Sequence, residues 1–462
     1  MRCYVKKETQ RGIGAFILNI FSMNKNIIGI RREDKNQWER RVSIIPELVR
    51  AILAEHGTDV IVQPSAIRVF SDEAYRDAGA VLDKNLARAS VIFGVKEIPS
   101  QLLEAQKTYV FFSHTVKGQA CNMPMLRRLM ELGCTLIDYE KITDEAGRRL
   151  VFFGRHAGLA GMIDTLWALG QRLEWEGVPN PFTMIKQAYH YRDLDEARDA
   201  VSAAGEAIRR DGLHESLKPL SIAFTGYGNV SRGAQEIFDL LPFREVSPKD
   251  LAVLENSGER HLIYKAVFRE ADMVVSNSGE ADFSLEDYYA HPKGYRSVFH
   301  NYLEHLTAVI NGIYWEQKYP RLITRNHLRK LFEEKPSPRL RLISDISCDV
   351  EGSIECTLKA TTPDHPVFVY DPIRGEMNDD LGSRGVVVLA VDNLPCELPR
   401  DSSVYFSGAL APFIPAIIAE DFTVEFEKST LPQEIKRAMI LCRGELTPHY
   451  QYMASHLKAH SA

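Results

Sequence analysis

The chain has 462 residues, of which 45% are hydrophobic and 26% are charged, and its net charge is -6. This length exceeds the roughly 250 to 300 residues at which a single hydrophobic core stops growing, so we expect two domains. The net charge gives no electrostatic indication of a nucleic-acid partner. The sequence has no uninterrupted apolar run of the roughly 18 to 20 residues needed to span a membrane. Seven scattered cysteines without a CxxC pair predict a reducing compartment and no structural metal.

The first 24 residues interleave four cations with the apolar run FILNIF (16–21), and Glu8 is their only acid. This pattern is typical of a mitochondrial presequence, which predicts a location in the mitochondrial matrix. The alternative is an ordinary terminal extension of a cytoplasmic protein, because serine is scarce and no cleavage site is evident.

Short apolar strands alternate with amphipathic helices in the first part of the chain. Such alternation predicts a parallel α/β sheet. The expected strands are 26–31, 59–64, 90–97, 108–114 and 134–140, and the expected helices are 46–57 and 123–133. A further helix over 156–176 opens with the small-residue run AGLAG (157–161), which would let it pack closely against another backbone, and we interpret it as a hinge helix.

A second α/β series predicts strands at 220–226, 271–277, 307–313, 341–347, 367–371 and 385–392. The expected fold class is therefore α/β, with two Rossmann-like doubly wound parallel-sheet domains and a cleft between them. Residues 25–152 plus 398–462 would form a substrate domain, and 153–397 a dinucleotide-binding domain. The segments 278–306 and 325–340 are longer than usual connections and would form lids or oligomer contacts.

The second series begins with the glycine-rich segment FTGYGNVSRG (224–233). Glycines at such a strand-to-helix turn permit a tight bend and bring backbone N–H groups to a pyrophosphate. Ser231 stands where GxGxxG has its third glycine, so the motif alone is no stronger than any glycine-rich turn. Its place at the start of an α/β domain favours a dinucleotide site formed by Gly226, Gly228, Asn229, Val230 and Ser231.

The next strand along the chain is expected at 244–248, and its exit carries Ser247 and Lys249. A hydroxyl and a cation at this point suit a ribose 2′-phosphate, whereas a carboxylate would bind a 2′-hydroxyl. We therefore expect NADPH. Glu245 and Asp250 flank the exit, and a solvated loop lysine is the alternative interpretation of Lys249.

Three strands of the first domain end in reactive side chains, namely Lys96, His114 and Glu140. Ligands of open α/β sheets bind beyond the carboxyl ends of the strands, so the three groups are expected in one crevice. Desolvation can lower the pKa of a lysine, and imidazole exchanges protons near neutrality. Each residue alone has a more ordinary interpretation, namely a snorkelling strand-end lysine, a capped turn histidine and a surface carboxylate, but their coincidence indicates an acid–base site.

Arginines cluster at 32–41 and at 147–158. Because guanidinium groups bind carboxylates bidentately, Arg41 and Arg149 are candidate anchors for a dicarboxylate or an amino acid.

Nine segments, in order, carry a resemblance to a known family. They are IRREDKNQWERRVSIIPE, IFGVKEIPS, VFFSHTVKGQA, LIDYEKITDEAGRR, FFGRHAGLAGM, FTGYGNVSRGAQEIF, INGIYWEQKYPRLIT, DISCDVEGSIECT and VDNLP. These segments resemble lysine–ketoglutarate reductase (saccharopine dehydrogenase, L-lysine-forming), the N-terminal half of bifunctional aminoadipic semialdehyde synthase. The resemblance covers nearly the whole chain after residue 25, with weaker kinship to fungal saccharopine dehydrogenases and, by fold, to alanine dehydrogenase and the transhydrogenase.

The resemblance implies that L-lysine condenses with 2-oxoglutarate and that NADPH reduces the imine to saccharopine, the first step of lysine degradation. It assigns Lys96 and His114 as the acid–base pair, in an order that the sequence leaves open. It implies that the substrate is bound by Lys35, Glu39, Arg41, Glu97, Glu140, Arg149 and Phe153, and that the cofactor side includes Asn311, Asp392 and Asn393.

Bifunctional relatives continue into a saccharopine dehydrogenase domain, whereas this chain ends at Ala462. We expect either a free-standing reductase or one half of a larger enzyme, without a second activity. The expected partners are a saccharopine dehydrogenase domain, in the same or another chain, and further copies in a homo-oligomer. Rival interpretations are an amino-acid dehydrogenase like alanine dehydrogenase, and a non-catalytic sensor of lysine or nucleotide.

Overall fold

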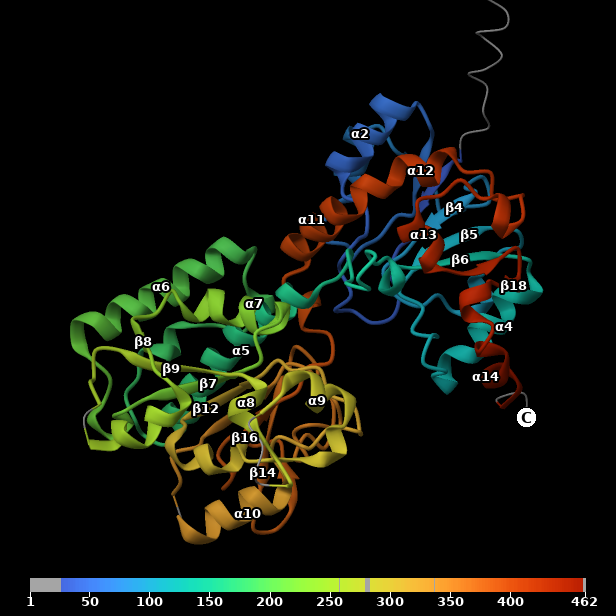
Figure 1. Cartoon of the computed structure of the whole chain (residues 1–462). Helices are drawn as coiled ribbons and strands as arrows, with labels where there is room; N and C mark the ends of the chain where they lie inside the picture. The colour runs from blue at the N-terminus through green and yellow to red at the C-terminus, as the bar shows by residue number, and fades with distance from the viewer. Residues whose placement is uncertain (1–25, 257, 279–282, 336, 460–462) are drawn as a thin grey trace, which may run out of the picture. The chain divides into compact units, whose positions relative to one another are not determined.

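The computed structural model describes residues 26–256, 258–278, 283–335 and 337–459, so the presequence expected over residues 1–24 lies outside it. The chain divides into two compact units. Unit 1 runs to Phe152 and resumes at Ser402, and unit 2 is Phe153–Asp401 (Figure 1).

Unit 1 is built on a sheet that has eight strands among the described residues, in the order β18-β17-β6-β5-β4-β1-β2-β3. The strands β1 to β6 are parallel, and β17 runs antiparallel to β6. The C-terminal segment, red in Figure 1, thus returns to extend the N-terminal sheet. The bounds are β1 Ile28–Ile30, β2 Val60–Val62, β3 Val81–Leu82, β4 Val91–Phe93, β5 Thr108–Phe111, β6 Thr135–Asp138, β17 Met439–Cys442 and β18 Glu445–Leu446.

The helices of unit 1 have local causes in the sequence. In α2, Pro46 occupies the first turn, where its missing N–H costs nothing, and Gly57 ends the helix in the left-handed region at φ 56°. Ser71 caps α3 by accepting a hydrogen bond from the Ala74 N–H. The bounds are α2 Pro46–His56, α3 Asp72–Asp77, α4 Met123–Glu131, α12 Ile414–Ala419, α13 Gln433–Ala438 and α14 Met453–Ala459, while α11, Pro399–Leu410, spans the boundary between the units.

The helical stretch Pro399–Ala419 is long and apolar enough to cross a membrane by length and composition, which the sequence analysis overlooked. Of its most apolar window, 44% is buried inside the protein. One such helix is weak support for a membrane span, because core helices of soluble proteins have the same composition.

Unit 2 holds a second sheet, with eight strands among the described residues, in the order β15-β14-β16-β13-β12-β7-β9-β8. Six neighbouring strands are parallel, namely β8, β9, β7, β12, β13 and β16. Strand β14 runs antiparallel to both β16 and β15. This confirms the expected α/β class with two mainly parallel sheets. The bounds are β7 Ser221–Thr225, β8 Phe243–Glu245, β9 Ile263–Phe268, β12 Ala308–Asn311, β13 Leu342–Asp345, β14 Val367–Asp371, β15 Glu376–Asn378 and β16 Val386–Leu389.

One expected strand of unit 2 is placed differently. Residues 271–277 were expected in the main sheet, but they begin in α8 (Glu270–Met273) and continue as β10 (Val274–Ser276). Among the described residues, β10 pairs only with β11 (Tyr295–Ser297). The main sheet instead contains β9, which the sequence analysis did not identify. The remaining helices of unit 2 are α5 Gly154–Trp175, α6 Leu194–Asp211, α7 Asn229–Phe238, α9 Leu285–Ala290 and α10 Arg325–Glu334.

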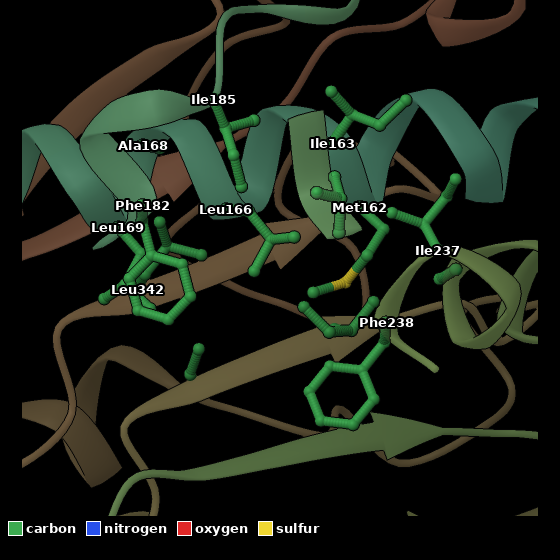
Figure 2. Packing of buried hydrophobic residues seen from close by; sticks show 14 of the residues in the cluster. Met162, Ile163, Leu166, Ala168, Leu169, Phe182, Ile185, Ile237, Phe238 and Leu342 are labelled. Carbon is green, nitrogen blue, oxygen red and sulfur yellow. The ribbon is translucent and has the colours of Figure 1, made fainter. Parts of the chain in front are cut away.

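Helix α5 forms the centre of the unit 2 core. Met162, Leu166 and Leu169 are fully buried and lie with Phe238 and Leu342 in one apolar cluster (Figure 2). The small residues expected to permit close packing do so, because a Cβ atom at Gly158 would overlap the carbonyl oxygen of Val230 in α7. Helix α7 is thereby held directly against α5.

Candidate active site

In unit 1, the candidate residues follow four neighbouring parallel strands. Their carboxyl ends lie at the same edge of the sheet, because β1, β4, β5 and β6 are adjacent and parallel. Lys96 and Glu97 follow β4, His114 follows β5 and Glu140 follows β6. The loop after β1 carries Lys35, Glu39 and Arg41.

Glu97 joins two of these segments. Its Oε1 lies 2.5 Å from Nδ1 of His114, and its Oε2 accepts a hydrogen bond of 3.2 Å from Nζ of Lys35. Burial raises the pKa of Glu97, but the hydrogen bond and the attraction from His114 outweigh it and bring that pKa to about 2. Because an ionised carboxylate only accepts, His114 donates through Nδ1 and presents Nε2 for proton exchange.

Hydrogen bonds also fix the backbone at His114. Its φ of 48° lies in the left-handed region, which non-glycine residues seldom adopt. Its carbonyl oxygen accepts a hydrogen bond of 3.1 Å from Nδ2 of Asn122. The preceding Ser113 is anchored to the buried Asp138 at the end of β6, whose Oδ2 accepts the Ser113 N–H at 3.1 Å and the Ser113 hydroxyl. The exits of β5 and β6 are thus locked together.

Lys96 lies among charges of both signs. Its pKa is lowered, first by burial and then by repulsion from Arg41 and Lys35, against attraction from Glu39 and Glu97. No hydrogen bond or ion pair of its Nζ occurs among the described residues. A lysine with a lowered pKa can lose and regain a proton under conditions in which an ordinary lysine stays charged.

Glu33 supports Lys96 and was missed in the sequence analysis. Its carboxylate accepts hydrogen bonds from the backbone N–H groups of Val95 (2.7 Å) and Lys96 (3.0 Å). Burial, followed by repulsion from Glu39, raises the pKa of Glu33 to about 7. Its place directly after β1, in the segment RRED, was the signal that could have identified it.

The two candidate anchor arginines differ sharply. Arg41 is buried and bound bidentately by Glu39, through Nε to Oε1 at 2.7 Å and Nη2 to Oε2 at 2.6 Å. Their side chains are 2% and 0% exposed. Arg149 is about half exposed and pairs with Glu140. Arg149 is therefore the more available of the two, while Arg41 is already neutralised.

In unit 2, the glycine loop follows β7, which is flanked by β9 on one side and β12 on the other. The strands that follow β7 along the chain lie first on one side of it, as β8 and β9, and then on the other, beginning with β12. The carboxyl ends of β7 and β12 therefore form the topological switch point. Gly226 takes φ +77°, and Gly228 precedes α7 without a side-chain cap. A Cβ at Gly228 would meet nothing within 4 Å. The loop and the N-terminus of α7 thus fit a dinucleotide pyrophosphate.

Other predicted cofactor residues differ in their surroundings. Ser231 is buried and accepts a hydrogen bond from Gln235, and Val230 packs partly buried against the core. Asn229 begins α7. Beyond β16, Asp392 is exposed and Asn393 is half-buried. Phe153 precedes α5 in unit 2.

Asn311 is fully buried, and its side chain is committed to the core. Its Nδ2 donates to Oδ1 of Asp345 (2.8 Å) and to Oγ of Ser353 (2.9 Å), and its Oδ1 accepts from Thr225 (2.9 Å). Both amide donors are therefore used within the protein. Asn311 thus fixes the ends of β7, β12 and β13 relative to one another.

Ser247 and Lys249 follow β8, as expected, but β8 is an edge strand that β9 separates from β7. The strand that follows β7 along the chain is therefore not its neighbour in the sheet. Sequence order along the chain does not reveal order within the sheet, and β9 takes the inner position with a buried, apolar strand.

Comparison with protein families agrees with this architecture. Residues 29–160 match the alanine dehydrogenase/PNT N-terminal domain, and residues 295–449 match the alanine dehydrogenase/PNT C-terminal domain. Together these matches cover more than half of the chain, which therefore belongs to this family. Residues 161–294, with the glycine loop and β9, lie outside both matches.

Among curated proteins, the chain is 37% identical over 443 residues to mitochondrial alpha-aminoadipic semialdehyde synthase of Bos taurus, and 38% identical over 450 residues to alpha-aminoadipic semialdehyde synthase of Arabidopsis thaliana. These alignments cover 93% of this chain but 48% and 41% of the relatives, so the chain spans about half their length. It is 27% identical to saccharopine dehydrogenase [NAD(+), L-lysine-forming] of Emericella nidulans, covering 84% of this chain and 92% of that one. The resemblance inferred from the sequence is confirmed.

Two solved structures share the fold. An L-alanine dehydrogenase superposes with a TM-score of 0.59 at 19% identity, covering 93% of this chain and 99% of that one. The transhydrogenase from Sinorhizobium meliloti gives 0.55 at 15% identity, covering 91% and 100%.

Proposed function

We propose that this protein condenses the side-chain amine of L-lysine with the ketone of 2-oxoglutarate and reduces the imine to saccharopine, in the mitochondrial matrix. The observation that carries the proposal is the group formed by Lys96, Glu97 and His114 at the carboxyl ends of two adjacent parallel strands. The relatives named for alpha-aminoadipic semialdehyde synthesis and lysine-forming saccharopine dehydrogenation support the substrates, and the mitochondrial names of the mammalian relatives support the location.

The reaction requires proton transfers that these side chains are suited to perform. The lysine ε-amine must lose a proton before its nitrogen attacks the ketone carbon, because its ordinary pKa is about 10.4. The hydroxyl group of the carbinolamine must then gain a proton so that it can leave as water. After reduction, the product nitrogen must also be protonated. Lys96, with its lowered pKa, is suited to accept the first proton, and His114 to supply the later ones.

Glu97 acts on His114 rather than on the substrate. Because its pKa is about 2, it stays ionised at working pH and holds the Nδ1–H of the ring. The His114 ring is thereby kept in one tautomer and one orientation, with Nε2 free. In many acid–base sites a third residue orients the base in this way.

The residues around the glycine loop fit a nicotinamide dinucleotide, which would supply the hydride for reduction. Gly226, Gly228 and the backbone N–H groups at the start of α7 would hold the pyrophosphate. We propose NADPH as the reductant, on the ground that a cation, Arg269, follows β9, the strand beside β7. The Emericella relative is named for NAD(+), so the choice requires a direct test.

One coupled assay tests the proposal against its rivals. Mixing the protein with NADPH, L-lysine and 2-oxoglutarate should consume NADPH and form saccharopine, detected by mass spectrometry. An alanine dehydrogenase-like enzyme would instead use ammonia with a 2-oxo acid and ignore lysine. A non-catalytic sensor would bind lysine or nucleotide and leave the NADPH absorbance unchanged.

A further inference from the structure

The strand beside β7 determines which residues approach the adenosine ribose of a bound dinucleotide. In the structure this strand is β9, which pairs with β7 from Ser221 opposite Tyr264 to Thr225 opposite Phe268. The Gly226 N–H also donates to the Phe268 carbonyl at 2.9 Å, so the glycine loop is tied to the exit of β9. In dinucleotide folds, the exit of the strand next to the first strand faces the ribose 2′ position.

Strand β8 is unsuited to this position. It lies outside β9, and its last residue, Glu245, is level with Lys265, three residues before Phe268. At about 3.3 Å per residue, β8 therefore ends about 10 Å short of the level at which the glycine loop begins. Ser247 and Lys249 lie beyond this earlier exit, with β9 between them and β7.

Two charged residues occupy the exit of β9. The Arg269 guanidinium carbon lies 5.7 Å from the ring centroid of Tyr227, which belongs to the glycine loop. Arg269 is exposed, and its guanidinium forms no ion pair with a carboxylate within the described ranges, although its backbone N–H donates to Oδ2 of Asp272 at 2.9 Å. The neighbouring Glu270 is occupied, because its Oε1 accepts hydrogen bonds from the hydroxyls of Tyr289 (3.0 Å) and Tyr227 (3.5 Å). Among the described residues, the Arg269 guanidinium is thus the charged group at this exit that has no ion-pair partner.

We propose that Arg269 binds the 2′-phosphate of NADP(H) and thereby selects it over NAD(H). The planar guanidinium offers paired donors that match phosphate oxygens, and its contact with the Tyr227 ring favours one placement of the fork above the loop. The inference rests on the proposed function, since it specifies the cofactor of that reaction. It moves the determinant of selection from Lys249 to Arg269.

The test measures binding separately from turnover. Isothermal titration calorimetry with 2′-phospho-ADP-ribose and with ADP-ribose, which both lack nicotinamide, reports the affinity for the 2′-phosphate alone. The variants are Arg269→Glu, the milder Arg269→Gln, the rival Lys249→Glu, and Arg329→Glu as a matched reversal of an exposed arginine in α10. Thermal melting checks that each variant folds, and steady-state kinetics then compares NADPH with NADH.

We expect wild type to prefer 2′-phospho-ADP-ribose. Loss of a charge-assisted contact typically costs about 1.5 to 3 kcal/mol, so Arg269→Gln should weaken that ligand by roughly tenfold or more and leave ADP-ribose unchanged. Arg329→Glu should keep the wild-type preference. The inference is overturned if Lys249→Glu removes the preference while both Arg269 variants retain it. Failure of wild type to bind either probe would overturn the proposed function itself, and with it the role of Arg269.

Discussion

At the scale of single residues, the acid–base assignment separates proton transfer from binding. Removing a general acid or base typically lowers the rate by about 10²- to 10⁴-fold. We therefore expect Lys96→Met and His114→Gln each to reduce turnover by at least the lower factor while NADPH still binds. The pH profile of turnover in wild type should be a bell, and each variant should flatten the limb of the missing group.

Glu97 provides the control for that assignment. Glu97→Gln keeps the size of the side chain but removes the charge that holds the His114 ring, so it should alter the same limb as His114→Gln with a smaller loss of turnover. If Lys96→Met and His114→Gln both keep near-normal turnover and an unaltered bell, the proton carriers must lie elsewhere, and Glu33 and Glu140 become candidates.

The two anchor arginines should respond differently to removal. Breaking a buried ion pair typically costs about 3 to 5 kcal/mol, because the remaining charge is left buried without its partner. Arg41→Ala should thus lower the free energy of unfolding markedly, since Glu39 is fully buried. Arg149→Ala removes a half-exposed side chain, so it should fold normally and raise the Michaelis constant for lysine or 2-oxoglutarate by roughly tenfold.

Urea unfolding of the two variants, together with substrate titrations, checks this contrast. Equal stability losses would mean that Arg149 is also structural. Unchanged substrate dependence in a well-folded Arg149→Ala variant would remove it from the site. The sequence predicted both arginines alike. The burial of Arg41 together with its partner Glu39, which distinguishes it from Arg149, is visible only in the fold.

At the scale of elements, two glycines serve opposite purposes. Gly158→Ala would drive a methyl group into the backbone of α7, so we expect it to destabilise unit 2 strongly. Gly228→Ala meets no protein atom and has an ordinary φ of -76°, so it should fold normally. The methyl group would instead occupy the space in which we place the pyrophosphate, and nucleotide binding should weaken.

Thermal melting and NADPH titration distinguish the two outcomes. A Gly228→Ala variant that binds NADPH as wild type does would argue against a pyrophosphate at this loop. A Gly158→Ala variant with an unchanged melting temperature would argue against the close packing of α5 on α7.

The sequence predicted individual strands better than their arrangement. Buried parallel strands are recognisable as short apolar runs, which is why β1, β4, β5, β6 and β7 lie within their expected ranges. The position of β9 beside β7 depends on long-range pairing, which no local pattern reveals. The same limit applies to Asn311, whose three side-chain partners come from β7, β13 and the loop containing Ser353.

At the scale of the whole molecule, several buried carboxyl groups act on stability in the same direction. Burial is the main cause that raises the pKa of Glu33 to about 7 and those of Asp164 and Asp345 to about 6. In unit 2, burial and then repulsion from Asp164 raise the pKa of Glu397 well above its ordinary value. Asp164 also accepts the Ala188 N–H at 2.7 Å, so its carboxyl joins α5 to the segment at Ala188.

A carboxyl whose pKa is raised by folding binds more protons in the folded than in the unfolded state. Its contribution to stability is therefore complete below its unfolded pKa of about 4 and is lost as pH rises through its folded pKa. His300 and His327 act oppositely, because burial lowers their pKa values, but they finish titrating near the ordinary histidine pKa of about 6.5. Glu97, with its pKa of about 2, affects stability only in acid. Between pH 6 and 8, the carboxyl groups should dominate.

We therefore expect the melting temperature to fall as pH rises from 6 to 8 at constant ionic strength. The pair formed by Asp164 and Glu397 tests the cause, because Asp164→Asn with Glu397→Gln keeps the shapes of both side chains and removes both ionisations. In this double variant the fall should be shallower, by about 2 to 4 °C for each kcal/mol of ionisation cost removed from a unit of this size. Asp421→Asn, an exposed carboxylate in unit 1, is the matched control and should keep the wild-type slope. Differential scanning calorimetry across this range decides the matter, since equal slopes in the double variant and wild type would show that the buried pair does not set the pH dependence.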